Sequence, residues 1–153
     1  MGSGSRWGCV AMSVILLVDD SPEVRELYTD VLERLGHLVI QAVDGAQALV
    51  LAREFLPDLV LTDLRLPRMD GCELSRRLRD DPRLHDVPVL LHSAEADPKE
   101  PDVTAFLSKP CELSTLEARV TELLEHEPLP DARLRSNFSN RRYAPLPVSM
   151  NSY

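Results

Sequence analysis

Short apolar runs alternate with amphipathic segments along this chain. Residues 14–18 form a continuous apolar run, which is typical of a strand that is covered on both faces of a sheet. Over 22–35, apolar residues recur at helical spacing, and Ser21 and Pro22 favour the start of a helix there. The same alternation continues further along the chain. The expected strands cover residues 14–18, 38–43, 59–62, 87–92 and 103–107, and the expected helices cover 22–35, 45–55, 71–81 and 113–124.

Strands and helices that alternate through short connections predict an α/β fold with a parallel sheet and helices on both faces. In such folds, functional sites form beyond the carboxyl ends of the strands. Polar side chains stand at these positions. Asp19 and Asp20 follow the first strand, Asp63 follows the third, Ser93 the fourth and Lys109 the fifth. We therefore expect these side chains to meet at one edge of the sheet.

The connection between the fourth and fifth strands is short and contains Pro98 and Pro101. A strand of five residues is about 17 Å tall, whereas nine helical residues rise only about 13 Å and nine extended ones reach about 30 Å. Residues 94–102 are therefore expected to cross the sheet largely extended, with at most one helical turn. A full helix between these two strands is expected to be shortened or missing.

The aspartates at the strand ends need a neutralising partner, because two carboxylates 4 Å apart repel by about 4 kcal/mol at an effective dielectric constant of about 20. Mg²⁺, or Mn²⁺ in its place, suits an open site of carboxylate oxygens. With this cation bound, a carboxylate is able to attack phosphorus and form an aspartyl phosphate. Lys109 would supply positive charge and Ser93 a hydroxyl donor. The sequence thus predicts that Asp63 accepts a phosphoryl group.

Composition narrows the possible functions. The 153 residues are 44% hydrophobic, which suffices for one globular domain, and they carry a net charge of −8. This acidic balance argues against a nucleic-acid surface, which needs clustered cations. The three cysteines form no CxxC pair, and no run approaches the roughly 18 to 20 apolar residues of a spanning helix. We expect a cytoplasmic protein that does not insert into membranes.

The two ends of the chain differ from its middle. Residues 1–12 begin with a Gly/Ser run and are expected to be a tag or a disordered segment. Residues 127–153 hold four prolines, four arginines and two acidic residues without an apolar period, which predicts a tail and no output domain. The tail either contacts its own acidic domain, binds a partner or is a disordered end. The globular domain is expected over 13–126.

Four pieces of the sequence together resemble the receiver domain of two-component response regulators. They are LVDD at 17–20, LTDLRLPRMDG at 61–71, SA at 93–94 and FLSKP at 106–110. The resemblance implies a flavodoxin-like, doubly wound sheet of five parallel strands. It implies a single-domain response regulator, phosphorylated by a histidine kinase or a phosphotransfer protein, that signals through a change of conformation to an output protein the sequence does not identify. Such a domain is not an enzyme beyond its own Mg²⁺-dependent phosphorylation and dephosphorylation.

The resemblance also implies roles for the residues at the strand ends. Asp20 and Asp63 would ligate the magnesium ion directly, together with the backbone carbonyl of Arg65. Asp19 would act through a water molecule, and Lys109 would pair with the phosphate.

Further positions resemble those that respond to the phosphate. Ser93 and Phe106 would be the switch residues that move on activation. Arg65 and Glu95 resemble the variable positions that tune the lifetime of the phosphate, and we hypothesise that they pair across the site. The Lys109–Pro110 bond is expected to be cis, as is usual in the family.

Other interpretations stay open beside this one. The short crossover departs from the family pattern at the face where many receivers dimerise, which puts the standard receiver dimer in doubt. A pseudo-receiver, which binds partners without phosphorylation, is the main alternative. A phosphatase of the haloacid dehalogenase type also forms an aspartyl phosphate, but it needs a second aspartate where this chain has Arg65. His92 lies in an apolar strand, which predicts a hydrogen-bonded core histidine.

Overall fold

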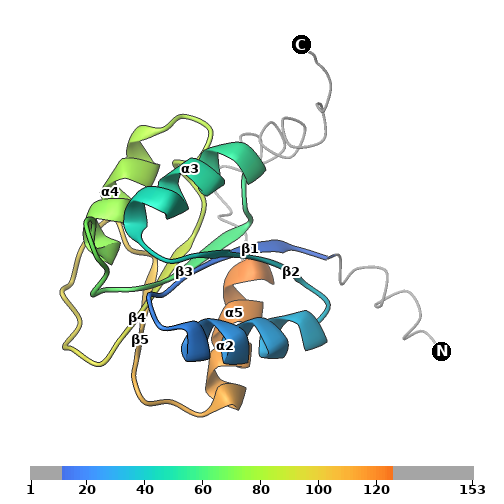
Figure 1. Ribbon diagram of the computed structural model, residues 1–153. Helices are drawn as coiled ribbons and strands as arrows, with labels where there is room; N and C mark the ends of the chain where they lie inside the picture. Colours follow the sequence, from blue (N-terminus) through green and yellow to red (C-terminus); the bar gives the residue numbers. More distant parts are fainter. Residues whose placement is uncertain (1–11, 126–153) are drawn as a thin grey trace.

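The fold is a single parallel sheet with two helices on each face (Figure 1), seen in a computed structural model that describes residues 12–125. The strands are β1 (Val14–Val18), β2 (Leu38–Ala42), β3 (Leu59–Asp63), β4 (Val89–Ser93) and β5 (Ala105–Ser108). The helices are α2 (Pro22–Arg34), α3 (Gly45–Phe55), α4 (Gly71–Asp80) and α5 (Leu113–Glu125). Residues 1–11 and 126–153 lie outside the described residues, and with them the expected tail at 127–153 and all but Met12 of the expected segment at 1–12.

The strand order is β2-β1-β3-β4-β5, and all neighbouring strands are parallel. This is the order of flavodoxin-like folds, so the predicted fold class is confirmed. Because the chain runs outward from β1 first to β2 and then to β3, the order reverses beside β1. The carboxyl ends of β1 and β3 therefore flank the place where such folds hold their sites.

Two apolar cores lie on the two faces of the sheet. Leu16 and Val60 pack with α3 and α4 on one face, and Ile15 and Leu61 pack with α2 and α5 on the other. Successive residues of a strand point to opposite faces, so a central strand covered by helices on both sides needs apolar residues throughout. This explains the continuous apolar run of β1, whose residues 15–18 are all buried.

The crossover from β4 to β5, residues 94–104, contains no helix, as the sequence predicted. Two arginines of α4 hold it in place. Arg76 Nη1 donates to Glu100 at 2.9 Å, and Arg79 Nη2 donates to the Thr104 hydroxyl at 3.3 Å. Strands β4 and β5 begin two residues later than predicted: β4 begins at residue 89 and not at 87, and β5 begins at residue 105 and not at 103. The reason is that the N–H groups of Val87 and Val103 donate to local turns and not to the sheet.

A close contact between α4 and β3 sets the backbone around Asp63. The Asp70 side chain caps α4 by accepting from the Glu73 N–H at 2.9 Å. The first helical residue, Gly71, lies so near β3 that an added Cβ would stand 2.5 Å from the Asp63 carbonyl oxygen. Only a residue without a side chain fits here, which accounts for the Asp-Gly pair in the sequence.

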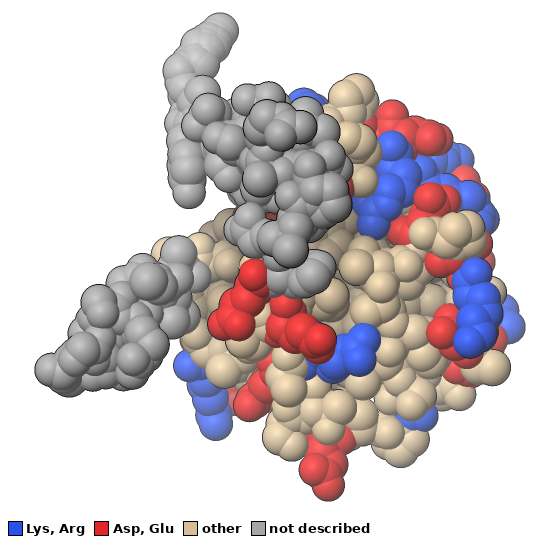
Figure 2. All heavy atoms as spheres, turned by 180° about the vertical axis from the view of Figure 1, so that it is seen from behind, with Lys and Arg blue, Asp and Glu red and all other residues tan. Residues whose placement is uncertain are grey.

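The surface carries charges of both signs. Figure 2 shows basic side chains next to acidic ones on the face seen from behind. Among the ion pairs of the described residues are those of Arg76 with Glu73 and Glu100. Within residues 12–125, no helix combines the length and the apolar character needed to span a bilayer.

Candidate functional site

Three aspartates meet at the carboxyl ends of β1 and β3. One carboxylate oxygen from each of Asp19, Asp20 and Asp63 lies within 4.8 Å of the other two. Asp19 is buried, Asp63 is half-buried and Asp20 is exposed, so the cluster opens to solvent on one side. The backbone N–H of Ser21 donates to Asp19 Oδ1 at 2.9 Å and orients this carboxylate. The predicted convergence of these three side chains is found in the structure.

Lys109 joins the aspartates from the end of β5. Its Nζ lies 3.3 Å from Asp19 Oδ2 and 3.2 Å from Asp63 Oδ2. Burial alone lowers the pKa of Lys109, but the two neighbouring carboxylates outweigh this effect, so the pKa is raised and the ammonium stays charged. The Lys109 N–H donates to the Ser93 carbonyl at 2.8 Å, and the Lys109–Pro110 peptide is cis, as expected.

Ser93 and the Arg65–Glu95 pair border the cluster. Ser93 is buried at the end of β4, and its hydroxyl accepts from the Glu95 N–H at 3.1 Å. The Arg65 guanidinium forms an ion pair with the Glu95 carboxylate, and the hydrogen bond to this carboxylate raises the pKa of Arg65. The hypothesis that these two side chains meet is confirmed. The contact joins the loop after β3 to the loop after β4.

Phe106, the second predicted switch residue, is half-buried on the side of β5 that faces α4, next to the small cluster of Leu64, Cys72 and Leu91. The crossover residue Val103 packs on the same cluster. The crossover contributes no helix to cover this cluster, and the Phe106 side chain stays half-buried.

His92 is a core residue, as the sequence predicted, and it has a partner that the sequence analysis missed. His92 Nδ1 lies 2.8 Å from the Leu107 carbonyl oxygen, and Nε2 lies 2.8 Å from the Tyr28 hydroxyl. Burial is the main cause that lowers the pKa of His92, and burial also raises the pKa of Tyr28. The missed signal was a tyrosine on the otherwise apolar face of the predicted helix 22–35.

The donor set of the cluster fits a hard divalent cation. Three carboxylates offer oxygen ligands, and one side is open for water and for phosphate oxygens, which Mg²⁺ prefers. Next to the cluster is an open pocket of about 420 Å³ that Asp20 and Arg65 help to line. This pocket provides an approach to the aspartates from solvent.

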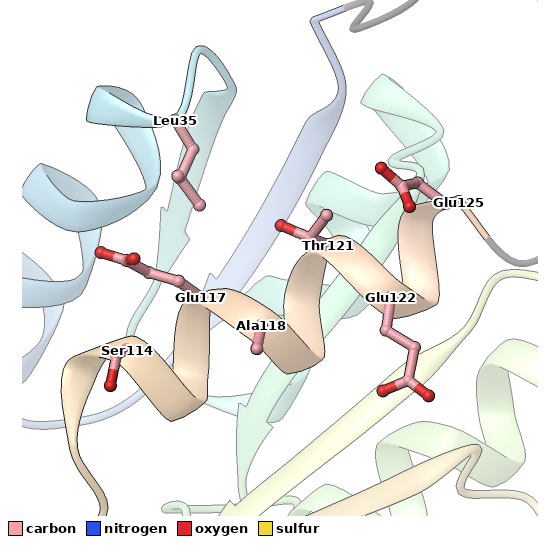
Figure 3. Close-up of a pocket in the computed structure, with 7 residues that line it drawn as sticks. All are labelled: Leu35, Ser114, Glu117, Ala118, Thr121, Glu122 and Glu125. Carbon is pink, nitrogen blue, oxygen red and sulfur yellow. The ribbon is translucent and has the colours of Figure 1, made fainter.

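A second pocket, of about 630 Å³, lies along α5. Figure 3 shows Leu35, just after α2, pointing toward α5, where the other six lining residues lie. None of the strand-end groups lines this pocket. Three of its residues are glutamates: Glu117, Glu122 and Glu125.

The sequence model of the response regulator receiver domain matches residues 15–121. This match covers well over half of the chain. The chain belongs to this family. The aspartate cluster and Lys109 lie at the strand ends where the sequence motifs predicted them. Membership in this family makes the chain a signal-transduction protein of the two-component type.

Curated relatives agree with this assignment. The DNA-binding dual master transcriptional regulator RpaA of Synechocystis sp. is 36% identical over 137 residues, which are 85% of this chain and 57% of RpaA. The polar-differentiation response regulator DivK of Brucella anthropi is 34% identical over 102 residues, which are 63% of this chain and 83% of DivK. The chain also matches 8% of the hybrid signal transduction histidine kinase D of Dictyostelium discoideum. The match thus spans 57% of RpaA and only 8% of the hybrid kinase.

Solved structures show the same fold. The chemotaxis protein CheY4 of Vibrio cholerae superposes with a TM-score of 0.69 at 29% identity, covering 74% of this chain and 99% of CheY4. The receiver domain of a sensor histidine kinase from Pseudomonas aeruginosa has a TM-score of 0.69 at 28% identity, covering 76% of this chain and all of that one. A magnesium ion is coordinated in the active-site cleft of the latter structure.

Proposed function

We propose that this receiver domain accepts a phosphoryl group on Asp63 from a histidine kinase or a histidine phosphotransfer protein, with Mg²⁺ or Mn²⁺ as cofactor. The observation that carries the proposal is the half-buried Asp63 carboxylate, which lies 3.2 Å from the Lys109 ammonium and within 4.8 Å of two further carboxylates. Asp20, Asp63 and the backbone carbonyl of Arg65 would hold the cation, and Asp19 would hold it through water. The bound ion would neutralise charge on the carboxylates and on the incoming phosphoryl oxygens.

The transfer is a displacement at phosphorus. An oxygen of Asp63 forms a bond to the phosphorus of the donor's phosphohistidine while the P–N bond breaks. The electron pair of the P–N bond stays on the donor imidazole, which takes up a proton from solvent. Lys109 needs no large movement to face the transferred group, because its Nζ already lies beside Asp63 Oδ2. Positioning of charge, and not acid–base chemistry, is the contribution of this residue.

The signal would then spread through the neighbouring strand ends. The Ser93 hydroxyl now accepts a hydrogen bond from the Glu95 N–H, and a hydroxyl keeps the ability to donate one to a phosphoryl oxygen. A movement of Ser93 toward the phosphate would pull on the short crossover. Phe106, half-buried under this crossover, would change its position in response. An output protein would recognise the changed surface.

Phosphorylation with a small-molecule donor tests the proposal. The full chain is incubated with acetyl phosphate and MgCl₂, and its intact mass is measured. We expect the addition of one phosphoryl group to the wild type and to Asp30→Asn, a control that neutralises an exposed aspartate of α2. We expect no addition to Asp63→Ala or after chelation of the metal.

Two outcomes contradict the proposal. Uptake of phosphate by Asp63→Ala would move the acceptor to another residue. A wild type that takes up no phosphate would favour the alternative of a pseudo-receiver, a module that binds its partners without being phosphorylated.

A further inference from the structure

A polar pair lies in the apolar layer below the aspartate cluster. His92 of β4 is 2% exposed and makes hydrogen bonds of 2.8 Å with both ring nitrogens, to Tyr28 of α2 and to the backbone of Leu107 in β5. The two rings lie close together, with centroids 5.5 Å apart. The surrounding residues on this face of the sheet are apolar, among them Leu61 and Leu90.

The chemistry of the partners determines where the protons are. A backbone carbonyl only accepts, so the hydrogen bond to Leu107 requires the proton on His92 Nδ1. Nε2 of the neutral ring is then an acceptor, and the Tyr28 hydroxyl donates to it. The pair is thus a directed chain of two hydrogen bonds that runs from α2 through β4 to β5.

This chain of hydrogen bonds joins the elements that carry the site. His92 stands directly before Ser93 and opposite Asp63 in the register of β3 and β4. Leu107, opposite His92 in β5, stands two residues before Lys109. Tyr28 belongs to α2, the helix that follows the Asp19–Asp20 pair. The hydrogen bonds therefore restrain the β5 backbone two residues before Lys109.

Filling the core does not require a polar pair. Two apolar side chains of similar size would fill the same space, and they would need no matching partners. A buried imidazole is tolerated only while both ring nitrogens are satisfied, which demands one particular arrangement of α2, β4 and β5. The pair is therefore suited to hold these three elements in a single relative position.

We propose that Tyr28 and His92 are positioning residues that hold the β5 backbone so that the Lys109 ammonium meets Asp63. The functional consequence of this positioning rests on the phosphoryl transfer proposed above. The position of the lysine itself is observable without any transfer. The hydrogen bonds of Tyr28 and His92 go to each other and to the Leu107 carbonyl, so the pair acts through the position of Lys109.

The chain offers a direct view of this lysine, because Lys99 and Lys109 are its only two lysines. Protein labelled with ¹³C and ¹⁵N in lysine gives two side-chain signals, and Lys99, on the exposed crossover, serves as the internal reference. The signals are recorded at constant pH without metal. In the wild type, we expect a Lys109 signal that is shifted from that of Lys99 by the two carboxylates. In Tyr28→Phe, we expect the Lys109 signal to move toward that of Lys99.

A control variant separates this effect from the loss of any hydroxyl on α2. The Thr29 hydroxyl is buried next to Tyr28 in sequence and has no hydrogen-bond partner within the described residues. Thr29→Val should leave the Lys109 signal unchanged. It should also leave the rate of phosphorylation by acetyl phosphate unchanged, whereas Tyr28→Phe should lower this rate about fivefold.

The double variant Tyr28→Phe/His92→Leu distinguishes positioning from stability. Replacing both polar side chains by apolar ones should restore part of the thermal stability that the single change removes, since only the Leu107 carbonyl then lacks its partner. In this double variant, the proposal expects the Lys109 signal to remain away from its wild-type position and closer to that of Lys99. An unchanged Lys109 signal in Tyr28→Phe, or full recovery of this signal in the double variant, would overturn it. A wild type that takes up no phosphate would instead refute the proposed function, and the lysine signals would still decide the role of the pair.

Discussion

Neutralising Asp20 should have opposite effects on stability with and without metal. At 4.8 Å, the upper limit for the separation of one oxygen from each carboxylate, two unit charges repel by about 3.5 kcal/mol at a dielectric constant of about 20 and by about 0.9 kcal/mol at about 80. Asp20 is exposed, so the lower figure applies. Asp19 is its neighbour in the unfolded chain as well, which leaves the contact with Asp63 as the main repulsion that folding creates.

Asp20→Asn should therefore stabilise the metal-free protein by about 1 kcal/mol. For a domain of this size, such a change raises the melting temperature by about 4 °C. Saturation with Mg²⁺ should reverse the order. A ligand at 100 times its dissociation constant stabilises the folded state by about 2.7 kcal/mol, and the wild type should gain this stability while Asp20→Asn gains little of it.

Differential scanning fluorimetry in a chelating buffer, followed by a titration with MgCl₂, measures both effects. Glu54→Gln is the matched control, because it makes the same change of charge at an exposed position of α3 and should respond to Mg²⁺ as the wild type does. The reasoning is wrong if Asp20→Asn lowers the melting temperature in the chelating buffer. It is also wrong if Mg²⁺ stabilises this variant as much as the wild type.

Three further changes test individual contacts. Gly71→Ala should destabilise the domain by about 1–3 kcal/mol in urea unfolding, because the new Cβ would stand 2.5 Å from the Asp63 carbonyl oxygen. Arg65→Ala should shorten the lifetime of the phosphorylated protein about threefold, measured by intact mass over time, because loss of the ion pair with Glu95 opens the site to water. Asp44→Ala should cost about 1 kcal/mol at pH 7, since it removes a helix cap. Hydrogen bonds hold the pKa of Asp44 below 3.8, so its contribution is present above that pH and is lost as the pH falls through the lowered pKa, which an acid titration of both proteins would reveal.

Each of these predictions has a contradicting result. A Gly71→Ala protein as stable as the wild type would mean that α4 shifts away from β3 at little cost. An unchanged phosphate lifetime in Arg65→Ala would remove the role of the ion pair. A stability difference between Asp44→Ala and the wild type that does not shrink as the pH falls from 5 to 2 would show that the carboxylate charge does not supply the stabilisation.

Much of the site followed from the sequence because strand ends are readable from apolar runs. Asp19, Asp63 and Lys109 each follow such a run, and parallel strands bring their carboxyl ends to one edge. The short crossover was predictable in the same way, since a few residues with two prolines leave room for an extended chain only. Strand starts were less predictable, because Val87 and Val103 have strand-forming side chains but donate their N–H groups to turns.

The sequence by itself determined the order of strands and helices, the residue types at each strand end and the short crossover, because all of these depend on local pattern and on chain length. Only the tertiary structure decided which polar side chains meet inside the core. Tyr28 and His92 are 64 residues apart, and their hydrogen bond was not predicted. The physical reason is that a buried hydrogen bond depends on the packing of whole helices and strands against each other, and neither partner carries a local sign of the other.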